Sequence, residues 1–201
     1  DEELDHMVGA MRKDPFMPKP PSSYQRIRSG EVLQVGERQW RIVLGEGHSP
    51  EHACLYCEED GILLAGDQVL PRITSNVMVS PIEPEGNPLK DWMASLQRLH
   101  SLPADTLVLP SHQGVFYGLH ERLDQIREHH EQQFDFLKSH LQQVGCASAA
   151  ELVPVLFPKL RGPVDRLMAL GETMAHLNLL YLAGELSRQS REGKIAYFSL
   201  T

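Results

Sequence analysis

Apolar and polar residues alternate in the first third of the chain, in short runs separated by glycine-containing turns. Residues 31–35 and 39–43 form two such runs on either side of Gly36, a spacing typical of a β-hairpin. Residues 53–57 and 62–65 repeat the pattern around an Asp-Gly turn. The sequence therefore predicts two consecutive hairpins in this region.

The apolar spacing becomes helical after residue 86. Asn87 and Pro88 are a typical N-cap and first-turn pair, and the residues after them predict a helix as far as Leu99. A strand at 106–109 separates this helix from a longer one at 119–144, which Gly145 would end. The expected apolar seam of the long helix is Leu119, Leu123, Ile126, Phe134, Leu137, Leu141 and Val144, with His130 in register.

The pattern changes character again beyond Gly145. Ser148 and Glu151 have the spacing of a capping box that opens a short helix. A second helix is expected over 164–183, followed by a terminal hairpin at 185–188 and 195–198. Along this second helix lie Leu167, Leu170, Met174, Leu177 and Tyr181. Helices followed by a hairpin indicate a small winged-helix module, so we place a domain boundary that divides the chain into 1–144 and 145–201.

Residues 1–30 are the least regular part of the chain. Leu4, Met7, Val8 and Met11 have helical spacing, but a series of prolines from Pro15 to Pro21 ends any helix there. Met17 and Tyr24 are apolar anchors in this proline-rich stretch. We therefore expect the stretch to pack on the body of the protein.

Composition and charge exclude several classes of protein. The 41% hydrophobic and 23% charged fractions are those of a soluble globular protein, and no run approaches the roughly 18 apolar residues of a membrane-spanning helix. The net charge of −8 disfavours indiscriminate binding to nucleic acid or to an anionic membrane. Cys54 and Cys57 would point to opposite faces of a strand, so we expect no disulfide framework and a reduced, cytoplasmic compartment.

Three separated motifs each place a good metal ligand directly after a strand-like run. The motifs are Gly47-His48-Ser49-Pro50-Glu51-His52, Ala65-Gly66-Asp67-Gln68 and Leu109-Pro110-Ser111-His112-Gln113-Gly114. A sheet with these strands side by side would bring His48, Asp67 and His112 to one rim. Imidazole and carboxylate groups are typical zinc ligands. The sequence therefore predicts that their ligand atoms lie within roughly 3–7 Å of each other, where a divalent ion could bind.

In order and context, these motifs resemble the last three metal motifs of the metallo-β-lactamase superfamily. The resemblance implies that His48 binds one ion, that Asp67 bridges two ions, and that His112 binds the second. The superfamily's main ligand cluster, His-x-His-x-Asp-His, belongs upstream of these motifs and does not occur in this sequence. The expected fold is therefore α/β (α+β): the C-terminal half of an αββα sandwich followed by a winged helix, similar to the β-lactamase-like protein 2 group.

The resemblance implies a metal-dependent hydrolase in which zinc-bound hydroxide attacks an ester, thioester or lactone. The alternatives are an endoribonuclease or phosphodiesterase, and a non-catalytic fragment that mediates dimerisation or nucleic-acid binding. Cationic side chains are scarce around the three motifs, so a small-molecule substrate is favoured over RNA. Two zinc ions are expected in the intact parent, whereas binding by this chain alone is expected to be absent, weak or completed by a neighbouring chain.

The resemblance also implies that a partner covers the strands. If half of the sandwich is missing, the inner faces of the strands at 32–35, 39–44 and 53–57 lose their apolar cover. We therefore expect the chain to self-associate or to pair with the missing N-terminal segment.

The remaining histidines have less specific patterns. His52 is expected to orient the loop that carries His48 rather than to bind metal. His129 and His130 lie in the middle of a helix, where we expect solvated or core-lining roles, and His176 has no pattern that indicates chemistry. The proline-rich segment 76–88 either lines the substrate pocket or is an ordinary surface loop, and the sequence leaves both interpretations open.

Overall fold

The computed structural model describes residues 21–191 and 195–201. The helical spacing from Leu4 to Met11, the expected anchor Met17 and the turn of the terminal hairpin at 192–194 lie outside these residues. Tyr24 is described, and 85% of it is exposed, so the expectation that it anchors the proline-rich stretch is wrong.

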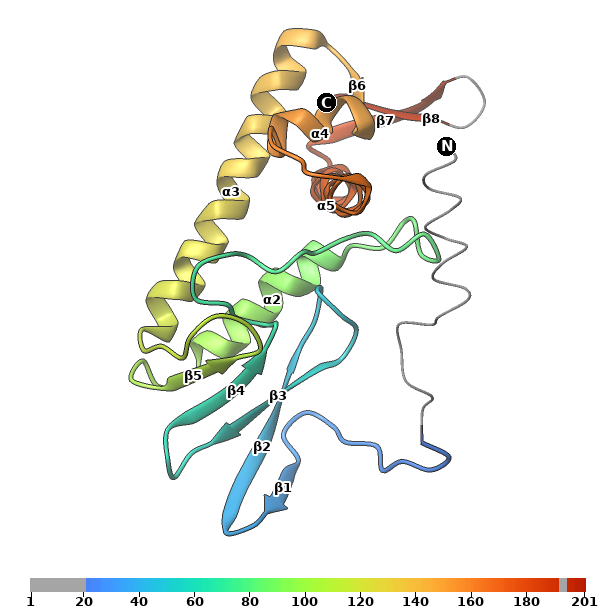
Figure 1. The fold of residues 1–201 in the computed structure, drawn as a ribbon. Helices are drawn as coiled ribbons and strands as arrows, with labels where there is room; N and C mark the ends of the chain where they lie inside the picture. Colours follow the sequence, from blue (N-terminus) through green and yellow to red (C-terminus); the bar gives the residue numbers. More distant parts are fainter. Residues whose placement is uncertain (1–20, 192–194) are drawn as a thin grey trace.

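A five-stranded sheet forms one end of the molecule (Figure 1). Its strands follow the chain in the order β1-β2-β3-β4-β5. Neighbours are antiparallel from β1 to β4, as the two predicted hairpins require, whereas β5 pairs parallel to β4 after the crossover helix α2. The strands are β1 (Val32–Val35), β2 (Arg38–Gly45), β3 (His52–Cys57), β4 (Ile62–Gly66) and β5 (Leu107–Pro110).

Helices α2 (Pro88–His100) and α3 (Leu119–Val144) cover one face of this sheet. The Asn87 side chain caps α2 by accepting a hydrogen bond from the backbone N–H of Lys90, as its sequence predicts. Trp92 and Leu96 of α2 and Leu123 of α3 pack against alternate strand residues in one hydrophobic core. The strand residues in that core are Val43, Cys54, Tyr56, Leu63, Ala65 and Val108.

The opposite face of the sheet also carries apolar side chains. Register pairs Leu33 with Trp40 and aligns Leu55 with Leu64, so these residues share one face. All four are partly exposed, as are Leu44 and Leu109 on the same face, although Ile42 beside them is buried. This apolar face is therefore less completely covered than the face under α2 and α3.

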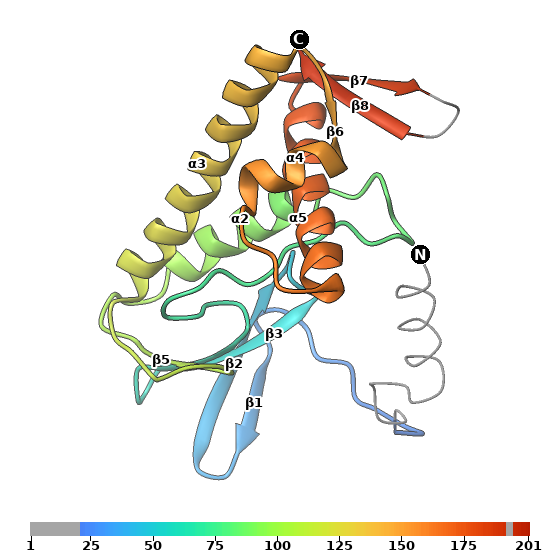
Figure 2. The same cartoon turned by 45° about the horizontal axis from the view of Figure 1, so that its top comes forward.

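The C-terminal part adds two helices and a small sheet (Figure 2). Its elements are β6 (Ala147–Ser148), α4 (Ala149–Leu156), α5 (Pro163–Leu182), β7 (Leu186–Arg191) and β8 (Ile195–Leu200), with sheet order β6-β8-β7. The predicted capping box is present, because Ser148 and Glu151 hydrogen-bond to each other's backbone N–H groups. The helices and the hairpin occur where the sequence predicts them, while the winged-helix assignment stays a prediction.

Helix α3 contributes to two hydrophobic clusters. Leu119, Leu123 and Ile126 belong to the core under the sheet, whereas Leu137 and Leu141 belong to a second cluster with α4, α5 and β8. Val144, predicted to continue the seam, is 49% exposed, because the helix ends there at the Gly145 cap. The second cluster therefore begins inside α3, before the predicted boundary at residue 145.

The buried face of α5 is more polar than its sequence pattern predicts. Of the apolar residues along the helix, Leu177 is buried, whereas Leu167 and Leu170 are 39% and 37% exposed. Glu172, Thr173, His176 and Asn178 are buried instead. His176 pairs with His130 of α3, which confirms a core-lining role for His130.

None of the helices in the described part of the chain is long and apolar enough to cross a membrane.

Candidate metal centre

Three strand ends meet at one rim of the five-stranded sheet. Strands β2 and β4 are each antiparallel to β3, so they run in the same direction, and β5 runs parallel to β4. The carboxyl ends of all three strands therefore lie on the same side. The loops that follow them carry His48, Asp67 and His112, which explains why motifs far apart in sequence become neighbours.

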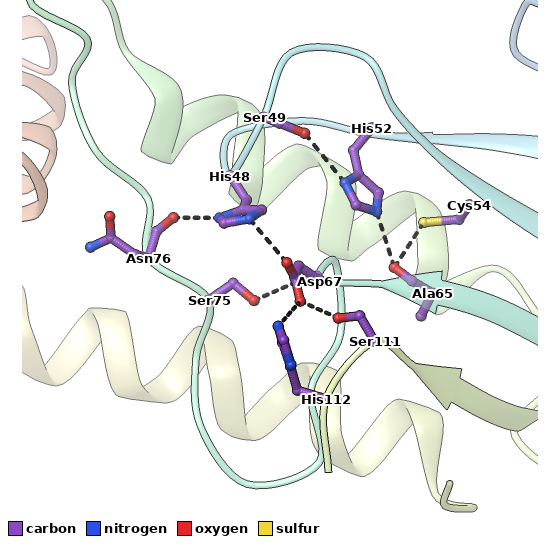
Figure 3. Close-up of polar contacts among 10 residues, drawn as sticks. All are labelled: His48, Ser49, His52, Cys54, Ala65, Asp67, Ser75, Asn76, Ser111 and His112. Atoms are coloured by element: carbon purple, nitrogen blue, oxygen red, sulfur yellow. Dashed lines mark hydrogen bonds and ion pairs between the residues drawn. The ribbon is translucent and has the colours of Figure 1, made fainter. Parts of the chain in front are cut away.

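Asp67 lies between the two histidines (Figure 3). His48 Nε2 is 3.4 Å from Asp67 Oδ2, and His112 Nε2 is 3.4 Å from Asp67 Oδ1. Each carboxylate oxygen thus faces a different imidazole. The predicted convergence of the three side chains is confirmed, while their role as metal ligands stays a prediction.

Close packing fixes the backbone of the His48 loop. Gly47 has φ of 97°, and a Cβ there would lie 2.5 Å from Trp92 Cβ and 2.6 Å from the Pro88 carbonyl oxygen. Only glycine fits both the conformation and the space. The start of α2 therefore presses the loop against the rim and sets where His48 emerges.

His52 links this loop to β4. Its Nε2 lies 3.2 Å from the Ala65 carbonyl oxygen and its Nδ1 lies 3.3 Å from Ser49 Oγ. Because a carbonyl can only accept, Nε2 donates and Nδ1 accepts from the serine hydroxyl. Burial lowers the pKa of His52, although the Ala65 carbonyl opposes that shift. Both ring nitrogens are occupied, consistent with the expectation that His52 orients the loop.

Three polar residues around His48 and Asp67 were not found from the sequence. The hydroxyl of Ser111 donates to Asp67 Oδ1, and that of Ser75 donates to the Asp67 carbonyl oxygen. The Asn76 carbonyl oxygen lies 2.7 Å from His48 Nδ1. Ser111 could have been found because it precedes His112 in the third motif, but no sequence pattern indicates a role for Ser75 or Asn76.

The surroundings favour an ionised Asp67. Burial alone would raise the pKa of this carboxyl group, but the hydrogen bond from Ser111 and the nearby imidazoles of His48 and His112 outweigh burial and lower it. The Asn76 carbonyl can only accept, so the proton of neutral His48 resides on Nδ1. The lone pair of Nε2 then faces Asp67, as a metal ligand requires.

The donor set fits divalent ions in type and spacing. A tetrahedral ion with ligands at about 2.0–2.1 Å separates two ligand atoms by roughly 3.4 Å, the distance found on both sides of Asp67. Each side offers one imidazole and one carboxylate oxygen. Accordingly, no group of three His, Cys, Asp or Glu side chains in the described residues surrounds a single ion position.

A pocket of about 430 Å³ opens beside His48. Part of the segment 76–88 forms its wall, including Met78, Ser80 and Pro81, so this segment lines a pocket, although Ile82 within it points to solvent. The charged lining residues are all acidic: Glu46, Glu51, Glu83 and Asp91. Desolvation and neighbouring Glu46 raise the pKa of Asp91. The pocket therefore disfavours an anionic ligand.

The guanidinium of Arg122, in α3, braces the loop that follows Asp67. It donates hydrogen bonds to the carbonyl oxygens of Leu70, at 2.6 Å, and Ile73, at 2.9 Å. Burial lowers the pKa of this arginine. A single side chain of the long helix thus satisfies two loop carbonyls.

Comparison with known families agrees with this geometry. Residues 2–112 match the description "Metallo-beta-lactamase superfamily", and residues 137–201 match "Metallo-beta-lactamase-like, C-terminal domain". The chain is 28% identical over 162 residues to an atrochrysone carboxyl ACP thioesterase of Aspergillus fumigatus, which covers 75% of this chain and 48% of that protein. It is also 28% identical over 181 residues to the probable metallo-hydrolase YqjP of Bacillus subtilis, with 86% and 53% covered.

Solved structures show the same relationship. The chain is 41% identical to a beta-lactamase domain protein from Burkholderia ambifaria, with a TM-score of 0.87, covering 100% of this chain and 60% of that one. A metallo-beta-lactamase family protein from Thermus thermophilus is 30% identical with a TM-score of 0.78, covering 98% and 64%. The chain spans about half the length of the curated relatives it matches. With more than half of its residues matched to that description, the chain belongs to the metallo-beta-lactamase superfamily.

Proposed function

We propose that this chain carries part of the active site of a metal-dependent hydrolase that cleaves an ester or thioester of a small molecule. The superfamily is generally hydrolytic and typically binds metal ions. His48, Asp67 and His112 would hold the metal, with zinc as the expected ion. The observation that carries the proposal is the carboxylate of Asp67, whose two oxygens each lie 3.4 Å from a different imidazole Nε2.

The described residues supply part of the ligand set. A catalytic zinc ion usually has three protein ligands. This rim offers each ion one imidazole and a shared carboxylate. We propose that the remaining ligands come from the N-terminal part of a longer parent protein or from a neighbouring chain. When bound, such an ion polarises a carbonyl oxygen and makes water more acidic.

The chain's own residues orient the donors. Ser111 holds one oxygen of Asp67 and helps to keep the carboxylate ionised. Asn76 fixes the proton of His48 on Nδ1, so that Nε2 stays a lone-pair donor. His52 hydrogen-bonds to both Ser49 and Ala65 and so holds the His48 loop against β4. These contacts would hold the ligands in place before an ion binds, which reduces the cost of ordering them.

The acidic pocket supports a small, uncharged or cationic substrate over RNA. Four carboxylates line the pocket beside His48. Two of them already have cationic partners, because Arg98 pairs with Glu46 at 2.6 Å and Arg26 pairs with Glu51 at 3.5 Å. A phosphodiester backbone would be repelled by this charge. Four curated relatives are named as thioesterases, which supports a thioester among the candidate substrates.

A chelation assay on the full-length protein tests this proposal. The substrates are a chromogenic ester, an acyl thioester and a short RNA, each before and after treatment with a chelator and after zinc is restored. We expect ester or thioester hydrolysis that chelation abolishes and zinc restores, with Asp67→Asn lowering the rate by at least about 100-fold. His140→Ala, a histidine on α3 away from the rim, serves as the control. Hydrolysis of RNA alone, or a rate that survives Asp67→Asn, would exclude this function.

A further inference from the structure

Helix α5 holds the loop that lines the pocket. This site loop, residues 68–87, lies along α5 in both views of the fold (Figures 1 and 2). The Val79 N–H donates to the Gly171 carbonyl at 3.1 Å, and the Asn178 amide donates to the carbonyls of Pro84 and Gly86 at 3.0 and 2.9 Å. The unexpectedly polar face of α5 thus satisfies the backbone of this loop.

Glu172 lies in the middle of this contact. Its side chain is 6% exposed and faces a small pocket of about 200 Å³ whose other lining residues include Phe157, Leu160 and Met168. Burying a carboxylate among apolar groups is costly unless a partner compensates it. Burial raises the pKa of Glu172 to about 7, and the hydrogen bond from Asn76 opposes that shift.

Asn76 joins Glu172 to the metal rim. Its side-chain amide donates to Glu172 Oε2 at 2.5 Å, while its backbone carbonyl accepts from His48 Nδ1 at 2.7 Å. Figure 3 shows the Asn76 side chain pointing away from His48 while its carbonyl points toward the ring. One residue therefore connects a buried carboxyl group on α5 to the imidazole that faces Asp67.

We propose that Glu172 is a positioning residue for the metal centre. By holding the Asn76 amide, it fixes the direction of the Asn76 carbonyl, and that carbonyl fixes both the ring orientation and the tautomer of His48. The inference rests on the proposed role of His48 as a ligand. It assigns part of the organisation of the site to α5, which lies in the C-terminal part of the chain.

A simpler role for Glu172 would be to anchor α5 to the site loop without any effect on His48. The two roles differ in what happens at the imidazole. An anchor affects the stability of the fold, whereas a positioning residue also changes the ring nitrogens of His48 in a protein that remains folded.

Nitrogen NMR of the metal-free, full-length protein at pH 8 separates these roles. Histidine ring nitrogens labelled with ¹⁵N report which nitrogen carries the proton. We expect the Nδ1-protonated tautomer of His48 in the wild type and in Glu172→Gln, whose amide oxygen still accepts from Asn76. Glu172→Met keeps the size but removes the carboxylate, which leaves the Asn76 amide with its longer contact to the Met168 carbonyl, at 3.4 Å. In this variant we expect a mixture of tautomers. Glu185→Gln, just beyond α5 in an exposed pair with Lys138, should leave His48 unchanged.

Asn76→Ala provides a second route if Glu172→Met fails to fold. It removes the amide that Glu172 holds and retains the carbonyl that His48 uses, so it should produce the same mixture of tautomers. An unchanged His48 in Asn76→Ala, or in folded Glu172→Met, would overturn the proposal.

Zinc affinity, measured by competition with a chelator, gives an independent readout. We expect Glu172→Met and Asn76→Ala each to weaken zinc binding about three- to tenfold, less than the roughly 10–100-fold typical of a direct partner of a ligand. The double variant should be no weaker than either single variant, because both changes break one connection. If the losses of zinc affinity from the two single variants multiply in the double variant, Glu172 and Asn76 do not act through one connection. A wild-type protein that does not bind zinc would exclude the proposed function, whereas the tautomer of His48 decides the present inference.

Discussion

His130 on α3 and His176 on α5 share a hydrogen bond in the core, with 3.2 Å between Nδ1 of the first and Nε2 of the second. The Glu172 carbonyl accepts from His176 Nδ1 at 2.8 Å, so His176 Nε2 is left as the acceptor and His130 Nδ1 as the donor. His130 Nε2 has no hydrogen-bond partner among the described residues. Both rings are therefore neutral in the folded protein.

This pair predicts loss of stability in mild acid. Burial lowers the pKa of both imidazoles below the ordinary value of 6.5. Neighbouring histidines add to the shift, although the hydrogen bond to the Glu172 carbonyl opposes it at His176. Their contribution is complete above pH 6.5 and is lost as the pH falls, because the unfolded chain takes up the protons first. Glu172 acts in the opposite direction, since its raised pKa of about 7 favours folding at low pH. Two histidines oppose one glutamate, so the unfolded chain binds more protons than the folded one in mild acid. The free energy of unfolding should fall by about 1.4 kcal/mol per unit decrease in pH for each proton of that difference.

Urea unfolding between about pH 8 and pH 5 measures this dependence. His130→Leu removes one buried site of protonation and should flatten the curve, even if it also lowers stability at the alkaline end. A curve with the same slope as the wild type would show that the pair does not titrate on unfolding.

Gly47→Ala should be costly. The new Cβ would lie 2.5 Å from Trp92 Cβ in a conformation with φ of 97°, so both the loop and α2 must shift. We expect a loss of about 3 kcal/mol or more in the free energy of unfolding, together with weaker zinc binding because His48 moves with the loop. Gly36→Ala is the matched control: its φ of 61° is also positive, but it has nothing within 4 Å. It should cost only about 1–2 kcal/mol.

Arg122→Met should loosen the loop after Asp67. The change leaves the carbonyls of Leu70 and Ile73 without their donor but keeps the aliphatic part of the side chain. Hydrogen exchange of the amides in residues 68–76 should accelerate by about tenfold or more relative to the wild type. Arg127→Met, which removes an exposed arginine paired with Asp124 on the same helix, should leave this exchange unaltered.

The apolar face of the sheet that α2 and α3 do not cover predicts association. Trp40, Leu55 and Leu64 are partly exposed on that face, and apolar surface of this kind is normally buried against a partner. We expect light scattering on the isolated 201-residue chain to show species larger than a monomer, and Leu55→Lys to reduce them. Ile82→Lys, at a residue 94% exposed on a loop, should have no effect. A monomeric wild-type chain would contradict the prediction.

Local patterns predicted most of the secondary structure because short-range chemistry determines it. The Asn87 cap, the capping box of Ser148 and Glu151, and the cap at Gly145 each depend on residues a few positions apart. The convergence of His48, Asp67 and His112 was also predictable, because each follows a strand and strands of one sheet share a rim.

The errors lie where a helix faces something other than a hydrophobic core. On α5, Leu167 and Leu170 are exposed, because the buried face contacts the backbone of the site loop and the ring of His130. Peptide groups and imidazoles need hydrogen-bond partners, so Asn178 and His176 occupy that face instead. Apolar periodicity contains no signal for such a partner, and Asn76 was missed for the same reason.

Helix α3 has a consequence for how the molecule comes apart. Because Leu123 belongs to one hydrophobic cluster and Leu137 to the other, the helix cannot fray at either end without exposing a core. The sheet and the C-terminal helices should therefore melt in a single transition and exchange their slowest amides at a common rate, as one foldon. Truncating the chain after residue 144 would expose Leu137 and Leu141 to water. The sheet rim that carries His112 would then rest on a helix that has lost its packing partners in the second cluster.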